Sequence, residues 1–339
     1  MERFIKPCMV TSPLVKVRFN ASINRTSEEC PMDEAKRKAE KSPYTASLKI
    51  HQLVVLEWLR HDEHRTGTNL VKKLRASKAN LPVTCIDCWS RQDVLDCIEK
   101  LTDDMSESDA KVPILHIEAH GFSPNGDGES AIGIVGPKSQ AGGEEILLWS
   151  DLAAPLRKLN LATAFNLLFV GAACWSDSSI YTVTASDFLP FMLAIGFSTT
   201  VYSNTLELAM VELYENLLIK SHSIQSSLNL AHEKLDTTSE KLAWFSLPLM
   251  IKNAALAAVN LTKDPSANED RYQHMVAELT AAGVAPLARD EFHRRHLTHA
   301  PAAIEKILSV LLAYDLLPAN RTRFGFDGKR LAMEALDKQ

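Results

Sequence analysis

A histidine and a cysteine, each at the end of a short hydrophobic run, are the residues of this chain that could do chemistry together. The run 111–119 is followed by His120-Gly121, and the run 166–173 is followed by Cys174. A cysteine thiol is mostly protonated at neutral pH, so it becomes a useful nucleophile only beside a base or in a positive potential. An imidazole within a few ångströms supplies that base and can later protonate a leaving amine. The pair therefore predicts attack by Cys174 on a carbonyl carbon, with His120 as general acid and base.

Such an attack places a negative charge on the carbonyl oxygen, and hydrogen-bond donors must stabilise that oxyanion. Gly121 has no side chain, so a substrate carbonyl can approach closely and the Gly121 N–H can point into the site. Together with the N–H of Cys174 it would form an oxyanion hole, in which each donor is worth roughly 10²–10³ in rate.

Three acidic residues are further candidates. His116, Glu118 and His120 alternate along one run, so we expect their side chains on one face of a strand. Glu118 could position the dyad or make a structural hydrogen bond. Asp177 and Asp187 follow the cysteine run and could line an acidic pocket for a basic substrate side chain, with helix capping or solvent exposure as the alternative.

Two other clusters suggest metal or redox chemistry, and each has a plainer explanation. Cys85 and Cys88 have the spacing of a zinc ligand pair, but no second pair stands at a matching distance. His293, His296 and His299 would share a helix side only loosely, so a solvated basic turn is the better interpretation. We expect no metal and no cofactor, with a metal-dependent hydrolase or a redox protein as the alternative.

The two hydrophobic runs must be strands for the dyad to form. Their unbroken apolar character indicates strands buried on both faces of a parallel sheet. Ligand crevices in such sheets lie just beyond the carboxyl ends of the strands. His120 and Cys174 therefore meet if their strands are parallel neighbours, and the chain between them is long enough for a hairpin, a crossover helix and the next strand.

Strands alternate with helices along the chain, which predicts an α/β fold with a mostly parallel central sheet and helices on both faces. A hairpin-like excursion is expected over 122–149, a helix N-cap at Ser150, and a mobile segment or exposed helix over the polar stretch 25–42. We expect strands over 14–19, 48–59, 81–88, 111–120, 166–174, 198–203 and 243–251. We expect helices around 70–74, 90–101, 150–159, 186–196, 206–220 and 224–235, and two more over 272–279 and 304–312 in a C-terminal appendage.

Composition excludes several classes of protein. The 339 residues are 46% hydrophobic and 23% charged with a net charge of −5, which is typical of a soluble globular protein. The scattered basic residues give no support for a nucleic-acid surface. No segment approaches the ~20 unbroken apolar residues of a membrane span. Six cysteines without framework spacing, and a start that lacks a secretory signal, predict a cytoplasmic protein.

The order of these features resembles the caspase-type cysteine peptidases, in which the histidine precedes the cysteine by about 50 residues. The likeness is closer to the bacterial CHAT-type branch. Its members also have a short Gly-Ile segment, here Gly133-Ile134, a Trp-Ser-Asp-Leu-like helix start, here 149–152, and a Tyr-containing helix followed by an Ala-rich one, here 206–235. The resemblance covers roughly 48–251.

This resemblance implies a caspase-hemoglobinase fold and hydrolysis of peptide bonds in a protein, with Cys174 as nucleophile, His120 as general acid and base, and Gly121 as an oxyanion contributor. The expected parts are a partly mobile N-terminal extension (1–47), a caspase-like peptidase domain (48–262) and a helical appendage (263–339). Residues 171–176 depart from the caspase pattern Gln-Ala-Cys-X-Gly. Ala172 stands where metacaspases that cut after Arg or Lys have an acid, so the cleavage preference is open.

The resemblance also suggests a bacterial regulatory or defence role. Such peptidases cut a dedicated protein and are switched on by a partner, and without a sensor repeat in this chain the activator would be a separate protein. We expect a protein or peptide substrate and an activating partner, with no nucleic acid and no membrane. The alternative is a catalytically silent caspase fold that acts as an interaction module through its C-terminal helices.

Overall fold

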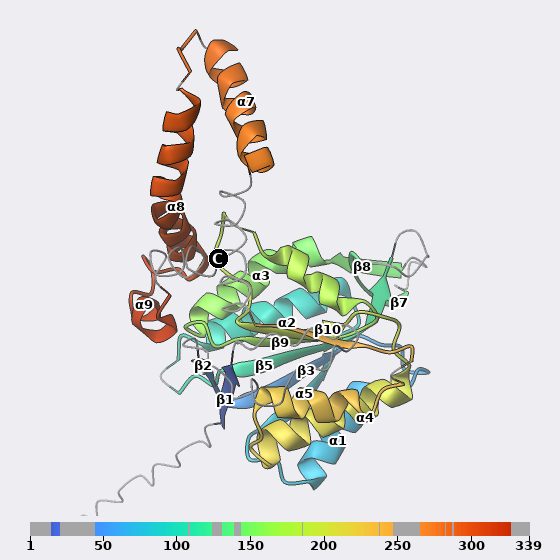
Figure 1. Cartoon of the computed structure of the whole chain (residues 1–339). Helices are drawn as coiled ribbons and strands as arrows, with labels where there is room; N and C mark the ends of the chain where they lie inside the picture. Colours follow the sequence, from blue (N-terminus) through green and yellow to red (C-terminus); the bar gives the residue numbers. More distant parts are fainter. Residues whose placement is uncertain are drawn as a thin grey trace, which may run out of the picture. The chain divides into compact units, whose positions relative to one another are not determined.

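A computed structural model describes residues 15–20, 45–107, 109–123, 131–138, 144–184, 186–236, 238–246, 265–281, 283–286 and 288–326 (Figure 1). The chain divides into two compact units. The first comprises Met1–Phe19, Ser47–Thr182 and Pro190–Trp244, and the second Asn20–Ala46, Val183–Leu189 and Phe245–Gln339. Among the described residues, no helix is long and apolar enough to cross a membrane.

A six-stranded sheet with the order β11-β10-β9-β5-β3-β4 is the main element of the fold. The four pairings between β4, β3, β5, β9 and β10 are all parallel. The predicted α/β fold with a mostly parallel sheet is therefore confirmed. The strands are β3 (Gln52–Glu57), β4 (Val83–Asp87), β5 (Pro113–Glu118), β9 (Leu168–Ala172), β10 (Leu193–Phe197) and β11 (Leu242–Ser246).

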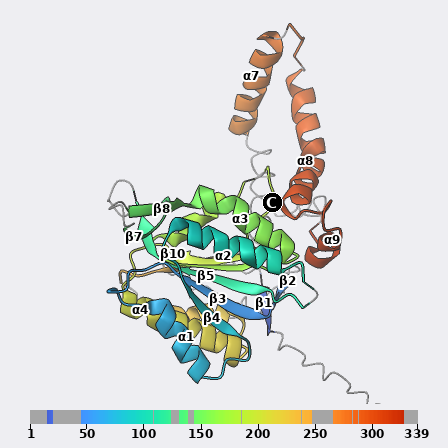
Figure 2. The same ribbon diagram turned by 180° about the vertical axis from the view of Figure 1, so that it is seen from behind.

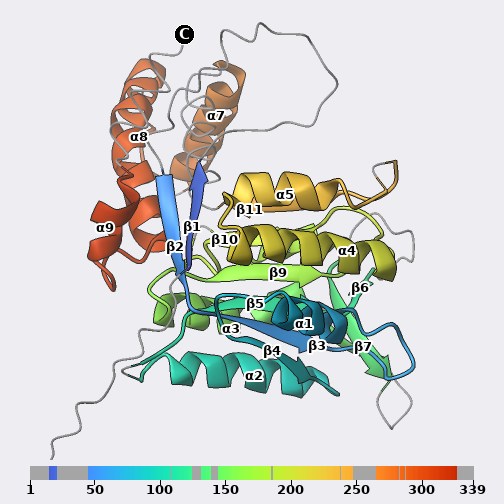
Figure 3. The same ribbon diagram turned by 90° about the horizontal axis from the view of Figure 1, so that it is seen from below.

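Helices cover both faces of this sheet, as predicted. Helices α2 and α3 pack together on one face, whereas α1, α4 and α5 pack together on the other (Figures 1 and 2). Figure 3 shows α1 and α4 beside each other over the strands. The helices are α1 (Thr66–Ala76), α2 (Arg91–Asp104), α3 (Trp149–Ala162), α4 (Ser203–Tyr214), continued by a π-helical turn (Glu215–Ile219), and α5 (Ile224–His232); a 3-10 helix, η2 (Ser176–Thr182), follows β9.

The predicted strand 111–120 is two strands in different sheets. β5 ends at Glu118, and His120 begins the short strand β6 (His120–Phe122), which pairs antiparallel with β7 (Gly133–Lys138); β7 in turn pairs with β8 (Glu144–Leu148). The expected hairpin is thus present in the described part of 122–149. The prediction that His116, Glu118 and His120 share one strand face is wrong, because the chain leaves the sheet at Ala119: the first two are buried and His120 is exposed.

The predicted strand 48–59 is also divided. β2 (Thr45–Ile50) belongs to a separate two-stranded sheet with β1 (Val15–Asn20), and β3 begins at Gln52. The N–H groups of His51 and Gln52 both donate to the carbonyl of Val112, at 2.9 and 3.3 Å. Two consecutive donors on one acceptor break the alternation of a regular strand there, so the chain changes sheets.

The helix predicted over 186–196 and the strand predicted over 198–203 are wrong, because β10 occupies Leu193–Phe197 instead. All five residues of β10 are buried, with Leu193 opposite Leu168 of β9. A short apolar run without periodicity does not distinguish a buried strand from a buried helix.

Of the two predicted helix N-caps, Ser90 is confirmed and Ser150 is wrong. Ser90 caps α2 through a hydrogen bond from the Asp93 N–H (3.1 Å), and the Asp93 carboxylate accepts the Ser90 N–H (2.9 Å). Ser150 does not cap α3. That helix starts at Trp149, two residues earlier than a cap at Ser150 would place it, and the Asp151 carboxylate accepts the N–H of the N-cap residue Leu148 at 3.3 Å.

The second unit contains the predicted C-terminal helices, α7 (Pro265–Ala281), α8 (Arg289–Leu311) and α9 (Ala319–Phe324). Gly283 follows α7 with a φ of +70°, a left-handed conformation that suits glycine at a helix end. The interpretation of 293–299 as a turn is wrong, because α8 runs through it. The polar stretch 25–42 lies outside the described residues.

Candidate active site

The two candidate catalytic residues follow neighbouring parallel strands. β5 pairs with β9 in parallel, with Glu118 opposite Ala172, so the predicted relation between the two hydrophobic runs is confirmed. The strand order also reverses at β3, since β4 lies on one side of it and the later strands on the other. A ligand crevice is expected beyond the carboxyl ends of the strands at such a point.

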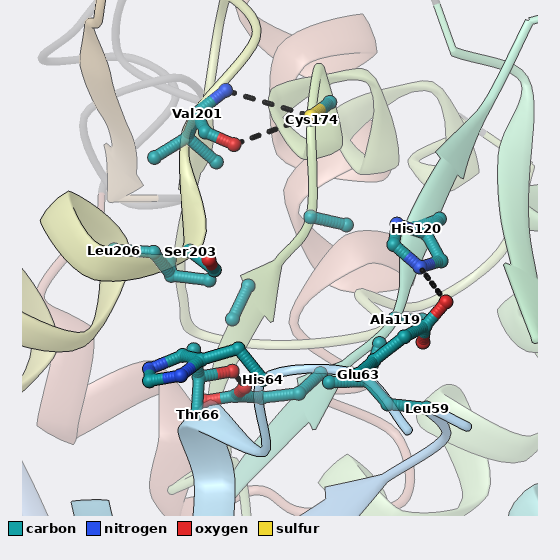
Figure 4. Close-up of a pocket in the computed structure, with 13 residues that line it drawn as sticks. Leu59, Glu63, His64, Thr66, Ala119, His120, Cys174, Val201, Ser203 and Leu206 are labelled. Atoms are coloured by element: carbon teal, nitrogen blue, oxygen red, sulfur yellow. Dashed lines mark hydrogen bonds and ion pairs between the residues drawn. The ribbon is translucent and has the colours of Figure 1, made fainter. Parts of the chain in front are cut away.

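A pocket of about 220 Å³ opens there, and both His120 and Cys174 line it (Figure 4). Its walls come from the ends of β3, β5 and β9 and from the starts of α1 and α4. The backbone at Gly121 touches that of Cys174: a Cβ added to Gly121 would lie 2.1 Å from the Cys174 carbonyl oxygen and 3.1 Å from its Cβ. Glycine is thus required for this close approach, and its oxyanion role stays a prediction.

His120 contacts an acid that the sequence did not single out. Its Nε2 lies 3.2 Å from Oε1 of Glu63, in the loop between β3 and α1, and their side chains are 57% and 27% exposed. The Arg60 N–H donates to Oε2 of Glu63 at 2.9 Å, which orients the carboxylate. An acid in a polar loop has no periodicity or spacing that marks it, so nothing in the sequence indicated this contact.

The thiol of Cys174 contacts Val201 rather than His120. The Val201 N–H donates to Sγ at 3.5 Å, and the thiol donates to the Val201 carbonyl at 3.8 Å. Figure 4 shows the sulfur turned toward Val201 and the imidazole turned toward Glu63. Burial raises the pKa of the Cys174 thiol, with the Val201 hydrogen bond opposing that rise, so this conformation holds a protonated thiol.

The turn after β9 holds the Cys174 backbone in place. Trp175 has a φ of +51°, a left-handed conformation that is strained for a bulky side chain. The Ser176 hydroxyl donates to the Gly171 carbonyl at 2.5 Å and accepts the Phe197 N–H at 3.0 Å. These bonds tie the turn to β9 and β10, so the strained residue is kept beside the candidate nucleophile.

A buried hydrogen-bonded chain lies beneath the pocket. Glu118 accepts the Thr66 hydroxyl on one carboxylate oxygen, and its other oxygen lies 3.0 Å from Nε2 of His116, whose Nδ1 lies 2.8 Å from the Tyr214 hydroxyl. Burial raises the pKa of Glu118, and His116 only partly offsets this. Among the described residues, Glu118 makes hydrogen bonds with Thr66 and His116 and not with His120. It could therefore position the His120–Cys174 dyad only indirectly.

Glu57, the register partner of Glu118, has the opposite electrostatic environment. Burial alone would raise its pKa, but hydrogen bonds from Thr68 and Arg65 outweigh burial and leave the pKa lowered. Its Oε1 also accepts the N–H groups of Gly67 (2.9 Å) and Thr68 (3.1 Å), so a strand carboxylate caps helix α1.

Glu57, Cys85 and Asp87 have ligand atoms within 4.8 Å of one another, as in a metal site. The guanidinium of Arg65, however, pairs with both carboxylates. Because this cation already neutralises them, the group fits a structural ion pair better than a metal site.

The two predicted pocket acids lie elsewhere. Asp177 is half-buried in η2, where burial raises its pKa, and it does not line the pocket. Asp187 belongs to the second unit, where its Oδ1 accepts the Phe188 N–H at 2.8 Å. The acids that do line the pocket are Glu63 and Glu118.

The chain matches no protein-family model, and no curated protein is similar to it.

Proposed function

We propose that this chain is a cysteine endopeptidase with a caspase-like fold, which hydrolyses peptide bonds in a protein substrate through Cys174 and His120. One observation carries the proposal: both residues line one pocket at the carboxyl ends of neighbouring parallel strands. The contact between Glu63 and the imidazole supports it further, because a base that must transfer protons needs a fixed ring orientation.

The contacts suggest how each group would act. With Glu63 accepting the Nε2–H, the Nδ1 lone pair of His120 remains available as a base. Cys174 turns from Val201 toward His120 and gives up its proton. The sulfur then bonds to the carbonyl carbon, whose π electrons move to oxygen. When the C–N bond breaks, the amine takes the proton from His120, and water assisted by His120 hydrolyses the thioester.

Substrate binding offers a reason for the thiol to move. The Val201 N–H and carbonyl now contact Sγ, and an extended peptide presents a matching main-chain donor and acceptor. A bound peptide would take over both Val201 groups and release the sulfur. The activating partner suggested by the sequence resemblance would act at the same step by biasing this rearrangement.

The alternative is a silent caspase-like fold that serves as an interaction module. The observation that favours it is the resting geometry, because a protonated thiol bonded to Val201 is not a prepared nucleophile. An experiment that supplies a peptide along with the reactive group separates the two functions.

Covalent capture by a peptidyl electrophile, read by intact mass and peptide mapping, is this test. We expect the wild-type protein to gain one adduct at Cys174, and Cys174→Ala and His120→Ala to lose it. Cys97→Ala is the control for labelling outside the pocket, since a hydrogen bond from Cys88 lowers the pKa of the half-buried Cys97 thiol to about 7; its removal should leave the Cys174 adduct unchanged. Adducts on other cysteines only, or none, would reject the peptidase.

A further inference from the structure

The pocket beside Cys174 is acidic. Two carboxylates, Glu63 and Glu118, line it, and among the described residues no lysine or arginine does; its two imidazoles, His64 and His120, are paired with Glu207 and Glu63. Glu63 lies toward the rim, where His120 and the Arg60 N–H contact it. Glu118 lies deeper, with its side chain 2% exposed. A side chain that enters this pocket therefore passes one carboxylate near the entrance and approaches a second one at the bottom.

The remaining walls suit an aliphatic chain. Apart from its few polar groups, the pocket is lined by small and aliphatic side chains, including those of Leu59, Ala172 and Leu206. Ala172 is the register partner of Glu118, so it faces the same side of the sheet and its single methyl leaves space beside the carboxylate. Lysine and arginine bury a methylene stem along apolar surface and keep a charge at the tip.

The carboxylate of Glu118 has room for another donor. Among the described residues, each of its oxygens has one hydrogen-bond partner, Thr66 on one and His116 on the other. An ionised carboxylate offers about four acceptor sites, so two are left for an ammonium or guanidinium group. An arriving cation also favours the ionised form of a buried carboxyl, and an electrostatic contact this far from water is only weakly screened.

We propose that the pocket binds a lysine or arginine side chain of the substrate, on the residue that supplies the carbonyl of the cleaved bond, with Glu118 as the specificity-determining residue. This inference rests on the proposed peptidase function for its position relative to Cys174. It replaces the sequence-based expectation that Asp177 and Asp187 form the acidic pocket.

The test compares matched peptidyl electrophiles that differ only in the residue next to the reactive group: lysine, norleucine, which has the stem without the charge, and aspartate. We expect wild-type protein to react with the lysine probe at least about tenfold faster than with norleucine, as a hydrogen bond to a charged group provides, and slowest with aspartate. In Glu118→Gln the lysine-to-norleucine ratio should fall toward one. A ratio within one variant cancels any general loss of activity.

Binding to Cys174→Ala separates this inference from the peptidase proposal. Nα-acetyl-lysine amide should bind this variant more tightly than Nα-acetyl-norleucine amide by NMR titration, whether or not the wild-type protein is an enzyme. Selective binding without labelling of wild type supports the pocket and rejects the peptidase. Labelling of Cys174 at equal rates by the lysine and norleucine probes, or fastest by the aspartate probe, overturns the pocket and keeps the peptidase. An undiminished lysine preference in Glu118→Gln overturns the role of Glu118.

Discussion

The sulfur of Cys174 contacts the main chain of Val201, whose N–H lies 3.5 Å from Sγ, although His120 lines the same pocket. The candidate nucleophile and its base are thus neighbours without a hydrogen bond between them in the described part of the chain. On the peptidase proposal, this is a resting state that substrate converts to a reactive one.

The first prediction concerns the resting thiol. Because burial raises the pKa of Cys174, iodoacetamide should alkylate it slowly at pH 7, with a rate that climbs only above the ordinary thiol value of about 8.5. His120→Ala should leave this resting rate unchanged, since no hydrogen bond joins the two side chains. Mass mapping of alkylated Cys174 across pH measures this. A rate that is already maximal at pH 6–7 and falls in His120→Ala would show a preformed ion pair instead.

The second prediction concerns Glu63. Removing its carboxylate in Glu63→Ala should lower kcat by roughly 10- to 100-fold with little change in KM. This is less than the ~10⁴-fold effect known for a buried carboxylate in a catalytic triad, because the Glu63–His120 pair is partly exposed.

A matched acid on the same loop serves as the control for Glu63. Asp62 pairs with Arg60 and not with His120, so Asp62→Asn should retain activity. Glu63→Gln should recover part of the loss, since its amide oxygen can still accept the Nε2–H. A change in KM alone, or equal losses in both loop variants, would point to a purely structural role for Glu63.

The third prediction concerns Gly121. A Cβ at this position would lie 2.1 Å from the Cys174 carbonyl oxygen, so Gly121→Ala must push the two backbones apart. We expect a loss of about 1–3 kcal/mol in unfolding free energy, as overpacking typically costs, together with loss of labelling at Cys174. Gly283→Ala is the control for labelling: a Cβ there meets nothing within 4 Å, and although its φ of +70° makes alanine cost some stability, the labelling of Cys174 should be unchanged. Normal stability and labelling in Gly121→Ala would contradict the close approach.

The fourth prediction uses the opposite environments of two register partners. Burial raises the pKa of Glu118 above the ordinary glutamate value of 4.5, so the folded state holds its proton where the unfolded state has lost it. Wild-type stability is therefore lost as pH rises from about 4.5 through the folded pKa, and Glu118→Gln should gain stability relative to wild type over that window.

Glu57 should give folding stability the opposite pH dependence. Its pKa is lowered, so its contribution is present above 4.5 and lost as pH falls through the folded pKa. Glu57→Gln should then be most destabilised at neutral pH and approach wild type in acid. Urea unfolding at several pH values measures both variants, and parallel pH curves for the two would contradict the assigned directions.

Patterning in the sequence was sufficient for the fold class, for most strands of the sheet and for the pairing of its two central runs. The runs that became β5 and β9 have unbroken apolar character, which follows from burial on both faces, but the predicted strand 111–120 included His120, whereas β5 ends at Glu118 and His120 begins β6. The same lack of periodicity concealed β10, because its five buried residues read equally as a helix.

The contacts that define the site's chemistry were beyond sequence reasoning. Glu63 reaches His120 from a loop whose path is set by the packing of β3 and α1, and Val201 contacts Cys174 through main-chain atoms that any residue possesses. The chain leaves the six-stranded sheet at Ala119, where Gly121 closely approaches Cys174. This contact joins residues far apart in the sequence, so local patterning does not reveal it.

Cleavage of a proteome-derived peptide library by wild type, with Cys174→Ala as the control, tests the proposed peptidase most directly. The peptidase proposal predicts new peptide termini with wild type only, and the pocket inference predicts lysine or arginine immediately before them. Absence of cleavage by wild type, or equal cleavage by Cys174→Ala, would contradict the central claim that this thiol is the nucleophile.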